Sequence, residues 1–282
     1  IKILDPACGS GAFLIAAFDY LWKEHERVYK EIKELKNKTA QGELFDFDSI
    51  NKTILENNLY GVDLNRESVE ITKLSLWLKT AAKNKKLNNL TSNIKNGNSL
   101  IDDKNVAGEL AFNWKKEFSS IMDAGGFDVV IGNPPYVFAR EKIFQEEKDF
   151  YIKNYDSAQY QVNTYLLFIE KGLKLLSKNA LIGIIVPNAW LMVSSAKNLR
   201  EYILENTSIK QIINLSGYSF EGVNVETIIM IGQKENQKSN EIEILLSKGK
   251  IFEYSHKKKQ DEFTKNEGFE LYVFSDDKGS KL

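Results

Sequence analysis

The sequence predicts an α/β fold with a mostly parallel sheet. Three short apolar runs are typical of buried strands, and each ends in small or polar residues that are typical of a turn. These runs cover residues 2–5, 59–63 and 127–132. Helices are expected between the strands. Further strands are expected at residues 93–96, 180–186, 210–215 and 225–233. In open sheets of this kind, ligands bind outside the carboxyl ends of the strands. The residues that follow each strand are therefore the first candidates for function.

The first predicted strand leads into a turn of small residues, Asp5-Pro6-Ala7-Cys8-Gly9-Ser10-Gly11. Gly9 and Gly11 let the backbone approach a ligand closely, and the helix expected from about Ala12 to Trp22 points its N-terminus at the same place. The two glycines are not followed by the third glycine of a dinucleotide fingerprint. This spacing disfavours a nicotinamide or flavin enzyme.

The second predicted strand ends in Asp63. A carboxylate at this position of such a sheet can accept two hydrogen bonds from a ribose diol. The same side chain could instead cap the helix that begins near Arg66, a role that acidic residues often fill. The residues alone do not decide between ribose binding and helix capping for Asp63.

The run at 127–132 ends at Asn133-Pro134-Pro135-Tyr136. Because proline has no N–H, the Pro134 carbonyl and the Asn133 side-chain oxygen can act as fixed acceptors beside the aromatic face of Tyr136. This arrangement suits an amino group on a flat heterocycle. An ordinary turn would use the same residues.

The later segments contain helical and strand patterns. Residues 136–162 are rich in aromatic and charged side chains, which fits either a mobile loop over a substrate or a packed helical cover. Residues 164–176 have an apolar stripe at helical spacing, typical of a core helix. The runs 210–215 and 225–233 predict a hairpin that closes the sheet. Insertions are expected around 39–49 and 102–126.

Composition limits the possible classes of protein. The 282 residues are 43% hydrophobic and 27% charged, enough for one large α/β domain and part of another. No run of 18 apolar residues occurs, so we expect a soluble protein that does not bind a membrane. A chain with one cysteine fits a reducing compartment, so we expect it in the cytoplasm. The single cysteine, Cys8, excludes a disulfide framework. No metal site is predicted.

The net charge of −1 means that contact with nucleic acid would depend on local clusters of basic residues. Such clusters lie at residues 83–86, 171–178 and 256–259. Each could equally be a solvated face.

Five motifs in order carry a family resemblance: DPACGSGAF (5–13), GVDLN (61–65), NGNSL (96–100), GFDVVIGNPPY (126–136) and ALIGIIVPNAWL (180–191). The set resembles the methyltransferases that modify adenine N6 in DNA with S-adenosylmethionine. Residues 59–82, and Phe112-Asn113-Trp114 leading to residues 125–128, more narrowly resemble the methylase part of type IIG restriction-modification enzymes and their phage-defence relatives. The resemblance extends to about residue 235. It implies a Rossmann-like methyltransferase sheet of seven strands, mostly parallel, with an antiparallel last hairpin.

The resemblance also implies roles for individual residues. The turn would hold the methionine part of S-adenosylmethionine. Its cofactor-binding residues would be Asp5, Ala7, Cys8, Gly9, Gly11 and Phe13. Asp63, with Leu64 beside it, matches the acid that binds the ribose. Asn98, followed by Ser99, matches the residue that reads the adenine of the cofactor, which is usually an aspartate.

In the same family, Asn133 and Pro134 match the acceptors of the target amino group, in a loop completed by Pro135, and Asn133 also borders the cofactor. Tyr136 matches the residue that stacks on the flipped base, and Phe220 resembles the aromatic residue that covers its other face. Cys8 is expected to be a small packing residue. Phe220 could equally be an exposed apolar residue without this role.

The implied activity is transfer of a methyl group to adenine N6 in double-stranded DNA, as part of a restriction-modification or phage-defence system. A nuclease or a specificity region would lie in the same polypeptide or in a separate subunit. Two alternatives stay open: a protein glutamine N5-methyltransferase, which uses an Asn-Pro-Pro-Tyr loop for an amide nitrogen, and a methylase-like DNA-binding module without activity.

Two regions are expected along the chain. Residues 1–238 would form a methyltransferase catalytic domain truncated at its N-terminus, because residue 1 already lies in the first strand. Residues 239–282 would begin a target-recognition region, because the composition turns polar there.

Overall fold

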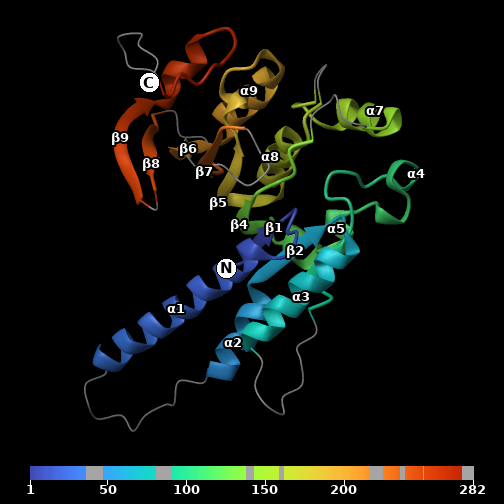
Figure 1. Ribbon diagram of the computed structural model, residues 1–282, viewed down its shortest axis with the longest axis vertical. Helices are drawn as coiled ribbons and strands as arrows, with labels where there is room; N and C mark the ends of the chain where they lie inside the picture. Colours follow the sequence, from blue (N-terminus) through green and yellow to red (C-terminus); the bar gives the residue numbers. More distant parts are fainter. Residues whose placement is uncertain are drawn as a thin grey trace. The chain divides into compact units, whose positions relative to one another are not determined.

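The computed structural model describes residues 1–35, 47–80, 90–137, 143–158, 162–215, 225–235, 239–249 and 251–274. The chain forms two compact units, a first unit of Ile1–Ser99 and a second unit of Leu100–Leu282 (Figure 1). Both contain strands and helices, which confirms the predicted α/β class. All seven predicted strands occur within a few residues of their expected bounds.

The first unit contains three parallel strands. The central strand, β2 (Leu59–Asp63), pairs with β1 (Ile3–Asp5) and with β3 (Ile94–Asn96). Their register pairs Asp5 with Gly61 and Asp63 with Asn96. The carboxyl ends of these strands therefore meet at one edge, as the sequence predicts.

Three helices pack on the strands of the first unit: α1 (Ala12–Leu35), α2 (Phe47–Asn57) and α3 (Arg66–Thr80) (Figure 1). Helix α1 buries Leu14 and Phe18 near its start, whereas its later turns expose ion pairs such as Arg27 with Glu31. Helix α3 buries Val69, Thr72 and Leu76, a stripe at spacings of three and four residues. One face of each helix thus faces the core of the unit.

The second unit contains six strands in the order β4-β5-β7-β6-β8-β9. Strand β4 (Phe127–Gly132) is parallel to β5 (Leu176–Pro187), and β7 (Thr227–Gln233) runs antiparallel between β5 and β6 (Ser208–Asn214). The predicted antiparallel pairing of β6 and β7 is therefore confirmed, but the pair does not close the sheet, because β8 and β9 follow β6. The predicted number of seven strands was too low, because the described residues form nine.

The two additional strands are β8 (Glu241–Lys248), which is parallel to β6, and β9 (Ile251–Lys259), which is antiparallel to β8. They follow the boundary expected at residue 238 and extend the sheet of the second unit. The alternation of polar and apolar residues in β8, whose burial changes from exposed Glu241 to buried Ile242, is typical of a strand. That these residues begin a target-recognition region stays a prediction.

The helices of the second unit vary in length. Between β3 and β4 lie α4 (Lys104–Ala107), η1 (Gly108–Leu110), α5 (Trp114–Glu117) and α6 (Ser119–Asp123). The segments on either side of β5 and after β9 form α7 (Gln145–Asn154), α8 (Thr164–Leu175), η2 (Asn188–Leu191), η3 (Ser194–Ala196), α9 (Lys197–Asn206) and η4 (Gln260–Lys265). The expected insertion at 102–126 thus folds into short helices, packed by an aromatic cluster in which the Phe112 and Trp114 rings lie 4.9 Å apart.

The segment around α7 is a packed helical cover where the structure describes it. Tyr151 and Tyr155 are buried, and the Tyr155 hydroxyl donates to the Leu100 carbonyl at 2.6 Å. The buried carboxylate of Glu170 in α8 accepts a hydrogen bond of 2.7 Å from the Ser157 amide just after α7. The residues 138–142 and 159–161 lie outside the described residues, as does most of the insertion expected at 39–49.

No helix in the described part of the chain is both long enough and apolar enough to cross a membrane.

Candidate active site

The turn after β1 depends on two glycines with left-handed backbone conformations. Gly9 has φ of +52° and Gly11 has φ of +86°. A Cβ atom on Gly11 would lie 2.8 Å from Thr72 Cγ2, too close for a side chain. A Cβ on Gly9 would meet no atom within 4 Å. The turn is therefore packed against Thr72 at Gly11 and is open at Gly9. An open glycine of this kind lets the backbone approach a ligand closely.

The side chain of Asp63 is hydrogen-bonded to the turn after β1. Its Oδ2 accepts a hydrogen bond of 2.8 Å from the Gly9 amide, and its Oδ1 accepts one of 2.9 Å from the Asn65 amide. The first turn of α3 is capped by Asn65, whose Oδ1 accepts from the Ser68 amide at 3.0 Å. The capping bond that was an alternative for Asp63 is thus made by Asn65. Each carboxylate oxygen of Asp63 has a further lone pair for a ligand.

Asp5 is almost fully buried, with 1% of its surface exposed. Its Oδ1 accepts a hydrogen bond of 3.0 Å from the Ala7 amide. Burial raises the pKa of the Asp5 carboxyl to about 7, the nearby charge of Asp63 also raises it, and the bond from Ala7 lowers it. A carboxyl with this pKa changes its charge near neutral pH.

Asn98 lies between two residues that are anchored to the same edge. The Gly97 amide donates to the Asp63 carbonyl at 2.9 Å, and the Ser99 hydroxyl donates to the Pro6 carbonyl at 2.6 Å. Asn98 itself is half-buried. The structure therefore brings Asn98 and Ser99 to the edge that holds Asp63 and the glycine turn.

The other residues expected at the cofactor differ in exposure. Ala7 and Phe13 are half-buried, and Leu64 is 55% exposed. Cys8 is buried, and burial raises the pKa of its thiol above the usual range. A thiol that is buried and kept protonated is a packing group, which agrees with the expectation for Cys8.

Two residues for which the sequence analysis predicts no role support this edge. The Thr72 hydroxyl donates to the Gly9 carbonyl at 2.8 Å. Asn96 Nδ2 donates to the carbonyls of Asp63 and Leu64 at 3.0 and 2.9 Å. A polar residue in the buried stripe of α3 is a signal that could have identified Thr72.

The loop after β4 lies in the second unit. The Tyr136 hydroxyl lies 2.5 Å from Asn133 Oδ1 and 3.3 Å from the Ile185 carbonyl of β5, so it can donate to either. The Tyr136 ring packs edge to face on the buried ring of Tyr165, with centroids 6.1 Å apart. Burial raises the pKa of the Tyr136 hydroxyl to about 12, so it stays protonated.

Thr164, the first residue of α8, contacts the same loop from the other side. Its hydroxyl donates to the Pro135 carbonyl at 2.7 Å and accepts from the Val137 amide at 3.1 Å. The Thr164 amide donates to the Val137 carbonyl at 3.1 Å. Pro134 is buried, whereas Pro135 and Asn133 are exposed. The loop is thus held on α8, with the Asn133 side chain at the surface of the unit.

The predicted site residues therefore form two groups. Those expected at the cofactor lie in the first unit, except Asn133, which lies with residues 134–136 in the second. Phe220 lies outside the described residues. Within the described residues, no group of three or more His, Cys, Asp or Glu side chains could hold a metal ion.

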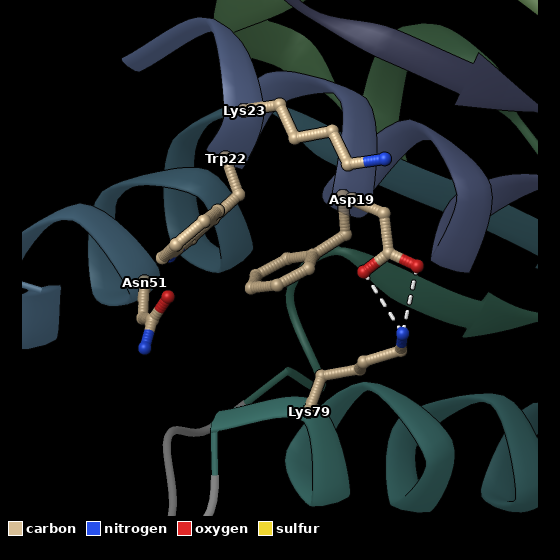
Figure 2. A pocket seen from close by; sticks show the side chains of 6 residues that line it. Asp19, Trp22, Lys23, Asn51 and Lys79 are labelled. Atoms are coloured by element: carbon tan, nitrogen blue, oxygen red, sulfur yellow. Dashed lines mark hydrogen bonds and ion pairs between the residues drawn. The ribbon is translucent and has the colours of Figure 1, made fainter. Parts of the chain in front are cut away.

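A pocket in the first unit contains none of the predicted site residues. Its lining consists of Phe18, Asp19, Trp22, Lys23, Asn51 and Lys79 from α1, α2 and α3. Figure 2 shows the Lys79 ammonium group held by both carboxylate oxygens of Asp19, at 2.8 and 2.7 Å. Asp19 and Lys79 are thus paired with each other in the lining of the pocket.

Comparison with known proteins identifies a family. The sequence model of the Eco57I restriction-modification methylase family matches residues 57–220, more than half of the chain. The type II restriction enzyme and methyltransferase RM.Eco57I of Escherichia coli is 29% identical over 83% of the chain. The adenine-specific methyltransferase PglX of Lacticaseibacillus casei is 23% identical, also over 83% of the chain.

The chain spans about a quarter of the length of these two relatives, 25% and 24% respectively. Among solved structures, the ATP-dependent Type ISP restriction-modification enzyme LlaBIII bound to DNA is similar, with a TM-score of 0.61 and 17% identity. That likeness covers 87% of this chain and 17% of the other. At this level of identity, it supports the fold alone.

Proposed function

Because the chain belongs to the Eco57I restriction-modification methylase family, we propose that it transfers a methyl group from S-adenosylmethionine to N6 of an adenine flipped out of duplex DNA. The observation that carries the proposal is the loop after β4. Asn133 Oδ1 accepts from the Tyr136 hydroxyl at 2.5 Å and keeps a second lone pair for a ligand. No described residue donates to the Pro134 carbonyl, and Thr164 holds the loop on α8. The adenine-specific name of the relative PglX agrees with this choice of target.

The first unit contains residues that fit S-adenosylmethionine. The cofactor would lie beside Gly9, where an added Cβ would meet no atom within 4 Å, and Asp63 retains lone pairs that can accept from ribose hydroxyls. Asn98 would meet the adenine of the cofactor, where its side-chain oxygen can accept from an amino group. The methyl group would be supplied, already activated, by the sulfonium of S-adenosylmethionine.

The second unit would act on the target base. The lone pair of adenine N6 is delocalised into the ring, so N6 is a poor nucleophile. Acceptance of both N6 protons by Asn133 and Pro134 would favour a localised lone pair directed at the methyl group. Tyr136 would stack on the base and offset part of the energy of a few kcal/mol needed to flip it out. The main contribution of the protein to the rate would be to align N6 of the adenine with the methyl group.

We also propose that a nuclease or specificity region accompanies this chain, in the same polypeptide or in a separate subunit. The name of RM.Eco57I joins a restriction enzyme and a methyltransferase in one protein, and this chain spans 25% of it. The alternatives of a glutamine methyltransferase or an inactive DNA-binding module have no support from the family match, which is to restriction-modification methylases.

A product analysis tests the proposed function. The full-length protein that contains this chain is incubated with duplex DNA and S-adenosylmethionine carrying a labelled methyl group, and the DNA is digested to nucleosides. We expect the label in N6-methyl deoxyadenosine. Label in cytosine or in protein glutamine, or no transfer at all, would refute the proposal.

A further inference from the structure

We propose that Thr164 is a positioning residue for the methyl transfer, because its hydroxyl holds the loop after β4 so that the Pro134 carbonyl remains available to the target amino group. The inference rests on the proposed function and deepens it. No motif in the sequence indicates this role, since Thr164 lies 29 residues from Pro135 along the chain.

The loop backbone needs an external support at its two prolines, although the Tyr136 hydroxyl contacts Asn133 Oδ1 within the loop. Pro134 and Pro135 have no N–H, so neither can donate a hydrogen bond that would fix the loop. Thr164 provides both kinds of partner at once: its hydroxyl donates to the Pro135 carbonyl at 2.7 Å and accepts from the Val137 amide at 3.1 Å. These bonds lie on both sides of Tyr136 and fix the backbone that carries its ring.

The backbone carbonyl groups of the loop differ in whether they accept a hydrogen bond. The Pro135 carbonyl accepts from the Thr164 hydroxyl, and the Val137 carbonyl accepts from the Thr164 amide at 3.1 Å. No described residue donates to the Pro134 carbonyl. Thr164 thereby occupies the neighbouring acceptors that could compete with Pro134 for the amino group of the base.

The position of Thr164 on its helix supports the same conclusion. Asparagine and threonine side chains commonly cap the start of a helix by accepting from its first amides. Asn163, which precedes α8, makes no such bond, and the Thr164 hydroxyl binds the loop instead. The next residue, Tyr165, is buried and packs against the Tyr136 ring. Helix α8 is buried along most of its length, so Thr164 and Tyr165 hold the loop from a rigid base.

The test uses variants of the full-length protein. Thr164→Val keeps the shape of the side chain and removes the hydroxyl, and Thr164→Ser keeps the hydroxyl. A misplacement of about 1 Å at a reacting group can lower a rate ~100-fold. We therefore expect Thr164→Val to lower kcat about 10- to 100-fold, while the Kd for S-adenosylmethionine and the KM for DNA stay within about threefold. Thr164→Ser should restore kcat to within about threefold of the parent protein.

Thr207→Val is the matched control. The Thr207 hydroxyl is buried in the same unit and has no hydrogen-bond partner among the described residues, so the same substitution there should leave kcat unchanged. The inference is overturned if Thr164→Val keeps kcat within threefold, if it also loses cofactor affinity or fails to fold, or if Thr164→Ser loses as much kcat as the valine variant. A parent protein that transfers no methyl group to adenine would instead refute the proposed function.

Discussion

The Gly9 amide donates a hydrogen bond of 2.8 Å to Oδ2 of Asp63, a residue 54 positions later in the chain. The bond joins the turn after β1 to the end of β2, so the two cofactor motifs of the sequence form one structure. Asp63 therefore fixes the turn, and we propose that its remaining lone pairs accept from the ribose of S-adenosylmethionine.

Asp63→Ala should weaken the binding of S-adenosylmethionine. A hydrogen bond to a charged group contributes about 1.5 to 3 kcal/mol, and the loss of two such bonds should raise Kd by at least about 100-fold. Calorimetric titration measures the change. Glu70→Gln on the exposed face of α3 is the control, and an unchanged Kd for Asp63→Ala would contradict the assignment.

The two glycines of the turn should respond differently to alanine. Gly11→Ala places a Cβ 2.8 Å from Thr72 and keeps a positive φ, so we expect a loss of about 1 to 3 kcal/mol in the free energy of unfolding. Gly9→Ala meets open space, so its loss of stability should be smaller, but its methyl group would enter the space proposed for the cofactor. Thermal unfolding and cofactor titration of both variants separate the effects. Equal losses of stability would argue against this packing.

Asp5 should make stability depend on pH. Its pKa is raised to about 7 in the folded protein, so its contribution to stability is complete below the unfolded pKa near 4 and is lost as the pH rises through about 7. Asp5→Asn stays neutral, so without cofactor it should be more stable than the parent at pH 8, by up to about 4 kcal/mol, and similar at pH 4. Thermal unfolding at several pH values measures the difference. Parallel pH profiles for the two proteins would contradict the raised pKa.

Tyr136 should act mainly through its ring. Tyr136→Ala removes the stacking surface, and the loss of about 1 to 3 kcal/mol should appear as weaker binding of DNA that contains a flipped base. Tyr136→Phe keeps the ring but loses the contact with Asn133, so we expect its methyl transfer to stay within about tenfold of the parent. Fluorescence of 2-aminopurine at the target position reports the flipped state. Equal defects in both variants would assign the main role to the hydroxyl.

Much of the fold could be predicted from the sequence because β1, β2, β4 and β7 are short and mostly apolar runs bounded by small or polar residues. Strands β8 and β9 were missed, although β8 has a strand-like alternation, because the polar composition of this region suggested a separate region. For these residues the prediction relied on composition, although the local alternation of polar and apolar residues was the better signal.

The motifs of the sequence indicate candidate site residues, but they do not indicate the residues that support them in the fold. Gly9, Asp63 and Asn133 stand in local patterns that indicate their chemistry. Thr72 and Thr164 bond to residues that are distant in sequence, and such partners appear only when the strands and helices are assembled. The cap of α3 belongs to Asn65 and not to Asp63, a choice between two nearby polar residues that depends on backbone geometry.

Methyl transfer by Asn133→Ala tests the proposed adenine methylation most directly. The full-length variant is compared with the parent for methylation of adenine in duplex DNA and for binding of S-adenosylmethionine. Because Asn133 lies in the second unit and the other residues proposed to bind the cofactor lie in the first, we predict that transfer falls by at least about 100-fold while the Kd for S-adenosylmethionine stays within about tenfold. Transfer at the rate of the parent would contradict the role assigned to Asn133.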